Sequence, residues 1–503
     1  MRKTHGAAKR SNKGNPIGFL NSGWRRSEGF DPKQAQQGAL QKSLAPSLAD
    51  AFHGQDPAGP AKDPIPSGYV NRNARAQLKA AMETLEAYLH RKHEELNLLN
   101  SFLSTPLSLR QPISVAEVIE RKFQLAAALK AEHTLHDWAL TETAWAYPSR
   151  LRAGPFEFSY DYQRADLDVR GPSFYQFDDP AANETIYTSS GMAAISALLL
   201  ASAQLMPDAD ILVLPGSYSE TVELIESYAR HLHLVPLKSS LGEITSGVSR
   251  LRVLLFDSCA PAAAFEGALR CANPRLDLVV FDTTCFSSGS GRIRRVLSWA
   301  HRWEIPTVLV RSHTKLDSLG LEYGRLGSAV FVDCDKRRVN QAQLKDLARE
   351  MRKAVRLFGG AALPAHFPPY VGTRAYRHLT DKRVSAILRN SRRTARHFAS
   401  ALVGSLAELH FAHGLYVTLM PKRMLDERRA KQIAADLCAD LSKAGLPLRH
   451  AGSFGFDFGA AEWFHDKTRD RHLVRIAIPD LPTSLWDHVA QAVAQWWSAH
   501  GKQ

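Results

Sequence analysis

The central part of the chain alternates between short apolar runs and amphipathic segments. Short, largely apolar runs lie at 210–213, 278–281 and 305–310, and the last two are followed by polar residues, which is typical of buried strands in a parallel sheet. The segment 193–200 is amphipathic and follows serines and a glycine, which predicts a helix. These elements predict an α/β protein, and in open α/β sheets ligands bind at the carboxyl ends of the strands.

Helices are expected both before and after this α/β region. Apolar residues recur at helical spacing from Leu78 to Leu96, and Ser114 with Glu117 forms a capping-box signature before a second helix. A proline-rich break at 364–369 precedes a smaller α+β domain. The elements expected in this domain are helices near 380–404 and 424–444, strands near 409–420 and 472–478, and a last helix from about 483.

The chain therefore divides into four expected parts. A basic leader rich in Gly, Pro and Gln is expected to be disordered, because it lacks the apolar residues of a packed core. An N-terminal helical extension, a large α/β domain and the smaller C-terminal domain follow it. Their bounds are 1–72, 73–150, 151–360 and 361–503, respectively.

Lys315 is the most informative residue for chemistry. It ends the segment Ser312-His313-Thr314-Lys315 after an apolar run, and Arg325 lies a short loop further on. A lysine amine attacks carbonyl groups only when it is unprotonated, and burial beside another cation lowers its pKa. The segment therefore predicts a nucleophile that forms a Schiff base, with Arg325 as the nearby cation or a phosphate ligand.

Three further segments carry groups that could bind a charged ligand. Asp282 ends the run 278–281, where its carboxylate invites a cationic partner. Ser190 and Gly191 precede the amphipathic helix, whose free N–H groups suit an anion such as phosphate. Arg475 interrupts an apolar strand of the smaller domain and presents a planar fork suited to a carboxylate.

Taken in chain order, these segments resemble the fold-type I pyridoxal-phosphate enzymes, above all the cysteine/methionine metabolism (transsulfuration) family. The segment 189–195 looks like the phosphate-binding segment of that family. Asp282-Thr283-Thr284 resembles its Asp-Asn-Thr, and Ser312-His313-Thr314-Lys315 resembles its Ser-x-Thr-Lys. The resemblance spans about residues 155–500 and implies a mainly parallel seven-stranded sheet flanked by helices.

The resemblance also implies roles for the matching residues and requires no metal. Lys315 would hold the aldehyde of pyridoxal 5'-phosphate and act as a catalytic base, Asp282 would pair with the pyridine nitrogen, and Arg475 would bind the substrate carboxylate. The other implied cofactor ligands are Ser190, Gly191, Met192, Tyr218, Thr284, Ser312, Thr314 and Arg325.

Tyr162 and Arg164 match a Tyr-x-Arg clamp that transsulfuration enzymes take from a neighbouring subunit. The match implies contact with the bound molecule across an interface. A homodimer or tetramer is therefore expected.

The expected reaction is β- or γ-elimination or replacement on a small amino acid, with a thiol, acyloxy or halide leaving group. One departure favours an alternative. The family's glycine-glycine-histidine after the lysine is missing, and Arg325-Leu326-Gly327 looks more like an aminotransferase motif. An aminotransferase would show turnover that depends on a keto acid.

The composition of the chain limits the cellular compartments in which the protein is expected. No apolar run approaches 18 residues, so no membrane span is expected. The basic start of the chain shows no secretory signal. The five cysteines lack metal-ligand spacing and an even disulfide framework, which favours a reducing cytoplasm.

The net charge of +14 raises the question of a nucleic-acid partner. Residues 1–75 hold 12 Lys and Arg against 5 Asp and Glu, and the remaining excess lies in short runs without interleaved aromatic residues. This pattern favours a solvated basic surface over a nucleic-acid-binding face. A non-catalytic, nucleic-acid-binding protein that kept the fold is the alternative from another class, and its affinity would fall steeply with salt.

Overall fold

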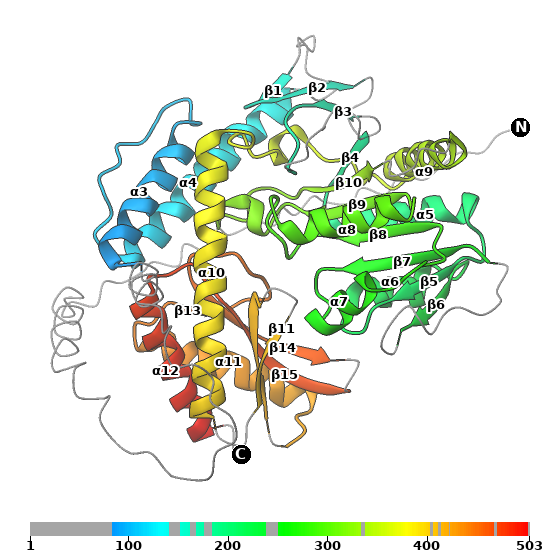
Figure 1. Ribbon diagram of the computed structural model, residues 1–503. Helices are drawn as coiled ribbons and strands as arrows, with labels where there is room; N and C mark the ends of the chain where they lie inside the picture. The colour runs from blue at the N-terminus through cyan, green and yellow to red at the C-terminus, as the bar shows by residue number, and fades with distance from the viewer. Residues whose placement is uncertain are drawn as a thin grey trace, which may run out of the picture. The chain divides into compact units, whose positions relative to one another are not determined.

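A seven-stranded sheet forms the centre of the large domain in the computed structural model (Figure 1). The strand order is β4-β10-β9-β8-β7-β5-β6, and within this sheet β10 runs antiparallel to both neighbours while the other pairs are parallel. The α/β class with a mainly parallel seven-stranded sheet is therefore confirmed. The strands are β4 Glu184–Thr188, β5 Asp210–Val213, β6 His233–Pro236, β7 Arg252–Asp257, β8 Leu278–Asp282, β9 Thr307–Ser312 and β10 Gly327–Val332.

The structure describes residues 83–139, 151–160, 167–175, 184–237, 250–332, 338–402, 406–410, 414–421, 423–466 and 470–500. All of them belong to one unit, Arg72–Gln503. The expected leader lies outside the described residues. The expected boundaries at 150 and 360 stay predictions.

Helices cover both faces of the seven-stranded sheet and bury its apolar side chains in two cores. One core contains Ile195, Ile225 and Met351 from three helices, and the other contains Phe265 and Trp299 from two helices. Because both faces are covered, the central strands are apolar at nearly every position rather than at alternate ones. The helices are α5 Gly191–Leu205, α6 Ser219–Tyr228 and α9 Arg338–Leu357 on one face, and α7 Ala262–Leu269 and α8 Gly291–Arg302 on the other.

Among the described residues, two helices precede the large domain, as the apolar spacing predicts. They are α3 Leu85–Asn100 and α4 Val115–Ala139. The capping box of α4 is confirmed, since the Ser114 hydroxyl accepts from the Glu117 N–H at 3.2 Å and the Glu117 carboxylate accepts from the Ile113 N–H at 2.8 Å. A small antiparallel sheet that the sequence analysis missed follows, with strands β1 Leu151–Ala153, β2 Phe156–Tyr160 and β3 Leu167–Arg170.

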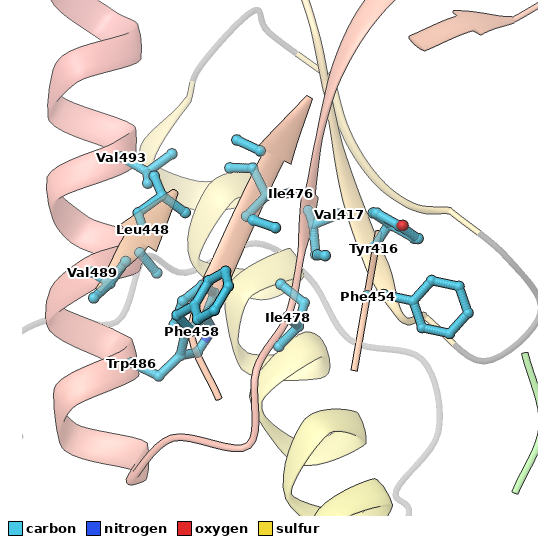
Figure 2. Packing of buried hydrophobic residues seen from close by; sticks show 14 of the residues in the cluster. Tyr416, Val417, Leu448, Phe454, Phe458, Ile476, Ile478, Trp486, Val489 and Val493 are labelled. Carbon is cyan, nitrogen blue, oxygen red and sulfur yellow. The ribbon is translucent and has the colours of Figure 1, made fainter. Parts of the chain in front are cut away.

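A five-stranded sheet and three helices form the C-terminal part, with strand order β11-β12-β15-β14-β13. Trp486, Val489 and Val493 of the last helix pack on Leu448 and Ile476 of this sheet (Figure 2). The three expected helices and the strand near 472–478 are confirmed near their expected positions, whereas the strand expected near 409–420 is two antiparallel strands, and β13 and β14 were not expected. The elements are α10 Arg374–Ala401, β11 Leu406–His410, β12 Tyr416–Met420, α11 Glu427–Lys443, β13 Leu448–His450, β14 Gly459–Asp466, β15 Arg471–Ala477 and α12 Thr483–His500, with the short 3-10 helices η4 Leu316–Ser318 and η5 Pro364–His366 upstream.

Among the residues that the structure describes, no helix is both long enough and apolar enough to cross a membrane.

Candidate active site

The start of α5 meets the end of β9 and the start of β10. Gly327 of β10 pairs with Thr188 on one side and with Ser312 on the other, so the ends of β4 and β9 lie at the same edge of the sheet. A Cβ atom at Gly327 would lie 2.2 Å from the Ser190 carbonyl carbon, and one at Gly191 would lie 2.9 Å from the Ser312 Cβ. Glycine is therefore required at both positions for this close approach.

Hydroxyl groups gather at this junction with the first N–H groups of α5. The Ser190 hydroxyl caps the helix by accepting from the Ala193 N–H at 3.0 Å. The Ser312 and Thr314 hydroxyls lie 3.2 Å apart, and the Ser312 N–H donates to the Thr284 hydroxyl at 3.0 Å. Hydroxyls and the positive end of a helix dipole together suit an anion such as phosphate. We call this arrangement, formed by residues 189–192 with Ser312 and Thr314, the phosphate cradle.

Two buried carboxyl groups end adjacent strands beside the cradle. Asp282 of β8 is the register partner of Asp257 of β7. Asp282 accepts from the Thr284 N–H at 2.8 Å, while Asp257 accepts from the N–H groups of Tyr218 at 2.8 Å and Cys259 at 2.7 Å. Burial, followed by the charge of Asp282, raises the pKa of Asp257 to about 7, and burial raises the pKa of Asp282. A cation placed beside this pair would be stabilised.

Asp257 has no role in the sequence analysis, although a signal was present. The apolar run before it ends in a carboxylate, as the run before Asp282 does. Because parallel strands end at one edge, two such runs on adjacent strands place two carboxyls side by side. Without a strand order, however, the sequence does not show that β7 and β8 are neighbours.

Asp257→Asn is expected to remove a pH dependence of stability. The folded-state pKa of Asp257, about 7, lies above its ordinary value. Between roughly pH 4 and 7 the folded chain therefore holds a proton that the unfolded chain loses, so the wild-type free energy of unfolding falls as pH rises through this window. Urea unfolding should show the variant gaining stability relative to wild type from pH 4 to 7 and no further change above. A difference between the two proteins that stays constant with pH would contradict this expectation.

The Lys315 amine contacts the C-terminal part of the chain. Its Nζ donates to the Ser453 hydroxyl, and it lies 3.5 Å from the Glu322 carboxylate, which accepts from the same hydroxyl at 2.7 Å. The ring of Phe454 lies 6.0 Å from Nζ and packs against Tyr416 (Figure 2). The structure thus places the lysine amine in a partly buried polar setting. Neither Ser453 nor Glu322 could be predicted from the sequence, because neither belongs to a recognised motif.

A buried cluster fixes the backbone on either side of Lys315. The Asp317 carboxylate accepts from Arg311 Nε and from another guanidinium nitrogen, each at 2.7 Å, and lies 2.7 Å from His313 Nδ1. His313 Nε2 lies 2.8 Å from the Ser328 hydroxyl. Burial opposes the charge of Asp317, but the Arg311 guanidinium lowers the pKa of that carboxyl to about 2. The cluster therefore ties the end of β9 to the loop that follows Lys315.

Arg475 lies in the C-terminal sheet opposite Glu462 of β14. Its Nε donates to Glu462 Oε1 at 2.6 Å, and its guanidinium lies 4.5 Å from the Tyr416 ring centroid and 4.7 Å from that of Phe464. Burial raises the pKa of Glu462, and the charges of Arg475 and then Lys315 oppose that rise. The arginine expected to bind a carboxylate is thus paired with a carboxylate of its own chain.

The remaining expected ligands fall in three places. Tyr218 is half-buried at the start of α6, where its N–H contacts Asp257. Arg325 is exposed, and its expected contact with a phosphate stays a prediction. Tyr162 and Arg164 lie outside the described residues.

A buried ionic cluster supports the loop after Lys315 and the loop that contains Ser453. Its side chains come from α3, α4, α10 and the C-terminal part. Lys122 of α4 donates to the Leu319 carbonyl, just after Lys315, and pairs with Asp457. Arg383 of α10 donates to the Gly455 carbonyl at 2.8 Å and to the Asp457 carboxylate at 2.7 Å. The cluster therefore holds the Lys315 loop and the Ser453 loop together. Its other members are Arg91, Lys92, Glu95 and Asp480.

The fold and these side chains define an α/β protein with an anion cradle, two buried carboxyl groups and a lysine amine at the carboxyl-end edge of its sheet. No family model matches the chain, and no curated protein matches it.

Solved structures similar to this chain include a cystathionine gamma synthase from Xanthomonas oryzae pv. oryzae in complex with aminoacrylate and cysteine, with 16% identity, a TM-score of 0.42, and coverage of 63% of this chain and 82% of that one. A putative O-acetylhomoserine (thiol)-lyase from Campylobacter jejuni with N'-pyridoxyl-lysine-5'-monophosphate has 13% identity, a TM-score of 0.44, and coverages of 61% and 81%. A methionine gamma lyase from Micromonospora echinospora has 15% identity, a TM-score of 0.43, and coverages of 62% and 81%. These are enzymes of the family that the sequence motifs resemble.

Proposed function

We propose that this chain is a pyridoxal-phosphate-dependent enzyme that acts on a small amino acid. The observation that carries the proposal is the meeting of the phosphate cradle, the carboxyl of Asp282 and the loop of Lys315 at one edge of the sheet. Thr284 and Ser312 join these parts directly, through the hydrogen bond between the ends of β8 and β9.

The groups present match the chemical groups of this cofactor. The cradle offers N–H and hydroxyl donors for the phosphate, and Asp282 offers a buried carboxyl for the protonated ring nitrogen. When bound, the cofactor supplies an electron sink for negative charge that develops at the substrate α-carbon. The residues that would hold the phosphate are Ser190, Gly191, Met192, Ser312 and Thr314.

Lys315 would move the proton. Its Nζ would take the proton from the substrate α-carbon and, in an elimination, transfer protons at the β-carbon. Ser453 and Glu322 contact the amine directly and would position it for this transfer. Arg475 would orient the substrate through its carboxylate.

We infer a lyase-type reaction, namely β- or γ-elimination or replacement with a thiol, acyloxy or halide leaving group. The supporting feature is the Ser-Gly-Met start of α5, which forms the cradle together with the Ser-x-Thr-Lys segment. Analysis of products separates this reaction from transamination: ammonia, keto acid or a replaced product without an added keto acid supports it. A strict need for a keto acid would instead identify an aminotransferase.

The assembly expected from the sequence belongs to the same proposal. A homodimer or tetramer in the cytoplasm, with Tyr162 and Arg164 reaching the neighbouring subunit's site, remains a prediction. Size-exclusion chromatography with light scattering measures the mass, and a monomer that turns over substrate at full rate would contradict the shared site.

Covalent trapping tests the cofactor directly. Purified protein incubated with pyridoxal phosphate is expected to develop an absorbance band at a longer wavelength than the absorbance of the protein alone. Borohydride reduction should then add one pyridoxyl phosphate group to a peptide containing Lys315, as mass spectrometry would show. No adduct on residues 312–325, in protein that is folded by circular dichroism, would refute the proposed function.

A further inference from the structure

The pairing of Glu462 with Arg475 has a consequence for substrate choice. The two residues are cross-strand partners in β14 and β15, and their side chains are only 15% and 11% exposed. The rings of Tyr416 and Phe464 also contact the guanidinium. Because both charges are largely removed from water, each depends on a nearby opposite charge.

Glu462 also lies next to the chain segment that contacts Lys315. A Cβ atom at Gly452 would lie 2.7 Å from Glu462 Oε2, so this oxygen rests against the Gly452 backbone. The next residue, Ser453, accepts from the Lys315 amine. The Glu462 carboxylate thus contacts the Arg475 guanidinium through one oxygen and, through the other, the segment whose next residue contacts Lys315.

A substrate carboxylate that binds Arg475 must therefore compete with Glu462. Once displaced, the Glu462 carboxylate would be left buried without its strongest cationic contact, which is costly. An ammonium group on the substrate side chain offsets this cost, because it gives Glu462 a new partner. Glu322 is a second carboxylate near the Lys315 amine. Its side chain is 38% exposed and lies 3.5 Å from Lys315 Nζ.

We propose that Glu462 is a specificity-determining residue that makes the site select amino acids with a cationic side chain over uncharged amino acids of the same length. The proposal rests on the proposed function and deepens it by naming the substrate class, in which the thiol or acyloxy leaving group itself carries the cation. Uncharged amino acids bind weakly because they displace Glu462 and give it no cation. Basic amino acids satisfy both Arg475 and Glu462.

Two matched ligands test this selectivity on the cofactor-loaded protein. α-Methylornithine and α-methylnorvaline have the same main chain and differ in the terminal ammonium, and their α-methyl group prevents loss of an α-proton. Isothermal titration calorimetry measures their affinities without relying on turnover. We expect wild type to bind α-methylornithine about tenfold more tightly or better, the range for a hydrogen bond to a charged group.

Variants at position 462 separate selectivity from support of the fold. In Glu462→Gln the ratio of affinities should fall towards one, chiefly because α-methylnorvaline binds more tightly when Arg475 is no longer neutralised. Glu462→Asp keeps the carboxylate and should keep a preference for α-methylornithine. The matched control Glu427→Gln removes an exposed carboxylate of α11, which pairs with Lys431, and should leave the ratio unchanged.

Two results would overturn the proposal. One is a wild-type ratio near one, which decides the matter even if the variants fail to fold. The other is an equal weakening of both ligands in Glu462→Gln, which would show that Glu462 only supports the fold. Borohydride trapping on Lys315, measured on the same preparation, separates the two proposals: an adduct together with a ratio near one overturns the selectivity alone, whereas the absence of an adduct overturns the proposed function and the selectivity with it.

Discussion

Lys315→Ala is expected to abolish covalent attachment of pyridoxal phosphate and to lower turnover by about 10²- to 10⁴-fold or more, the range for loss of a proton-transfer group. The reason is that the amine is both the point of attachment and the base. Alanine leaves the phosphate cradle intact, so non-covalent binding of pyridoxal phosphate should persist with weaker affinity. Mass spectrometry after borohydride reduction, absorbance titration and steady-state kinetics measure these three quantities.

A second lysine provides the matched control. Lys353 of α9 is about half-exposed and pairs with Glu350 on the helix surface. Lys353→Ala should therefore keep the adduct at Lys315 and the wild-type rate. Equal turnover by Lys315→Ala and wild type would show that another group performs the chemistry.

Asp457→Asn is expected to cost about 3–5 kcal/mol of folding stability, the range for removing one partner from a buried ionic cluster. Asp457 pairs with Lys92, Lys122 and Arg383, and all four side chains are almost fully buried. Burial opposes its charge, but these cations lower its pKa well below the ordinary value. The stabilisation is therefore fully present above about pH 4 and is lost as pH falls towards the folded-state pKa.

Urea unfolding of wild type and variant at pH 7 and at lower pH measures this effect. Asp487→Asn is the matched control, because Asp487 pairs with Arg393 in a half-buried ion pair, and it should cost about 1 kcal/mol or less. Equal losses in the two variants would show that the buried cluster contributes no more than a surface pair. The Asp457 variant should also weaken the support of the Ser453 loop, because Arg383 contacts both Asp457 and Gly455.

The sequence predicted helices and strands well in segments that show a single clear hydrophobic pattern. The run at 210–213 became β5 with the same bounds, and the helix after Ser190 became α5. The missed sheet β1–β3 consists of strands of three to five residues, which are too short for their alternation to stand out. Their pairing depends on contacts with residues that lie outside the segment, such as Phe367 beside Phe156 and Phe158.

The residues of the candidate site also differ in whether a local sequence pattern indicates them. Ser190, Asp282 and Lys315 could be proposed from the sequence because each lies at or shortly after the end of a recognisable strand or just before a helix. Ser453 was missed because its contact with Lys315 spans more than a hundred residues of sequence. Glu462 was missed because it meets Arg475 only through the pairing of β14 with β15.

The sequence by itself determined the class of fold, the order of its main elements and the residue types that offer cofactor chemistry, because periodicity and strand-end residues are local properties of the chain. Only the tertiary structure decided which groups meet: the pairing of Asp257 with Asp282, the contact of Lys315 with Ser453, and the neutralisation of Arg475 by Glu462. The physical reason is that strand order and domain packing bring distant residues within hydrogen-bonding distance, and no local pattern encodes those distances.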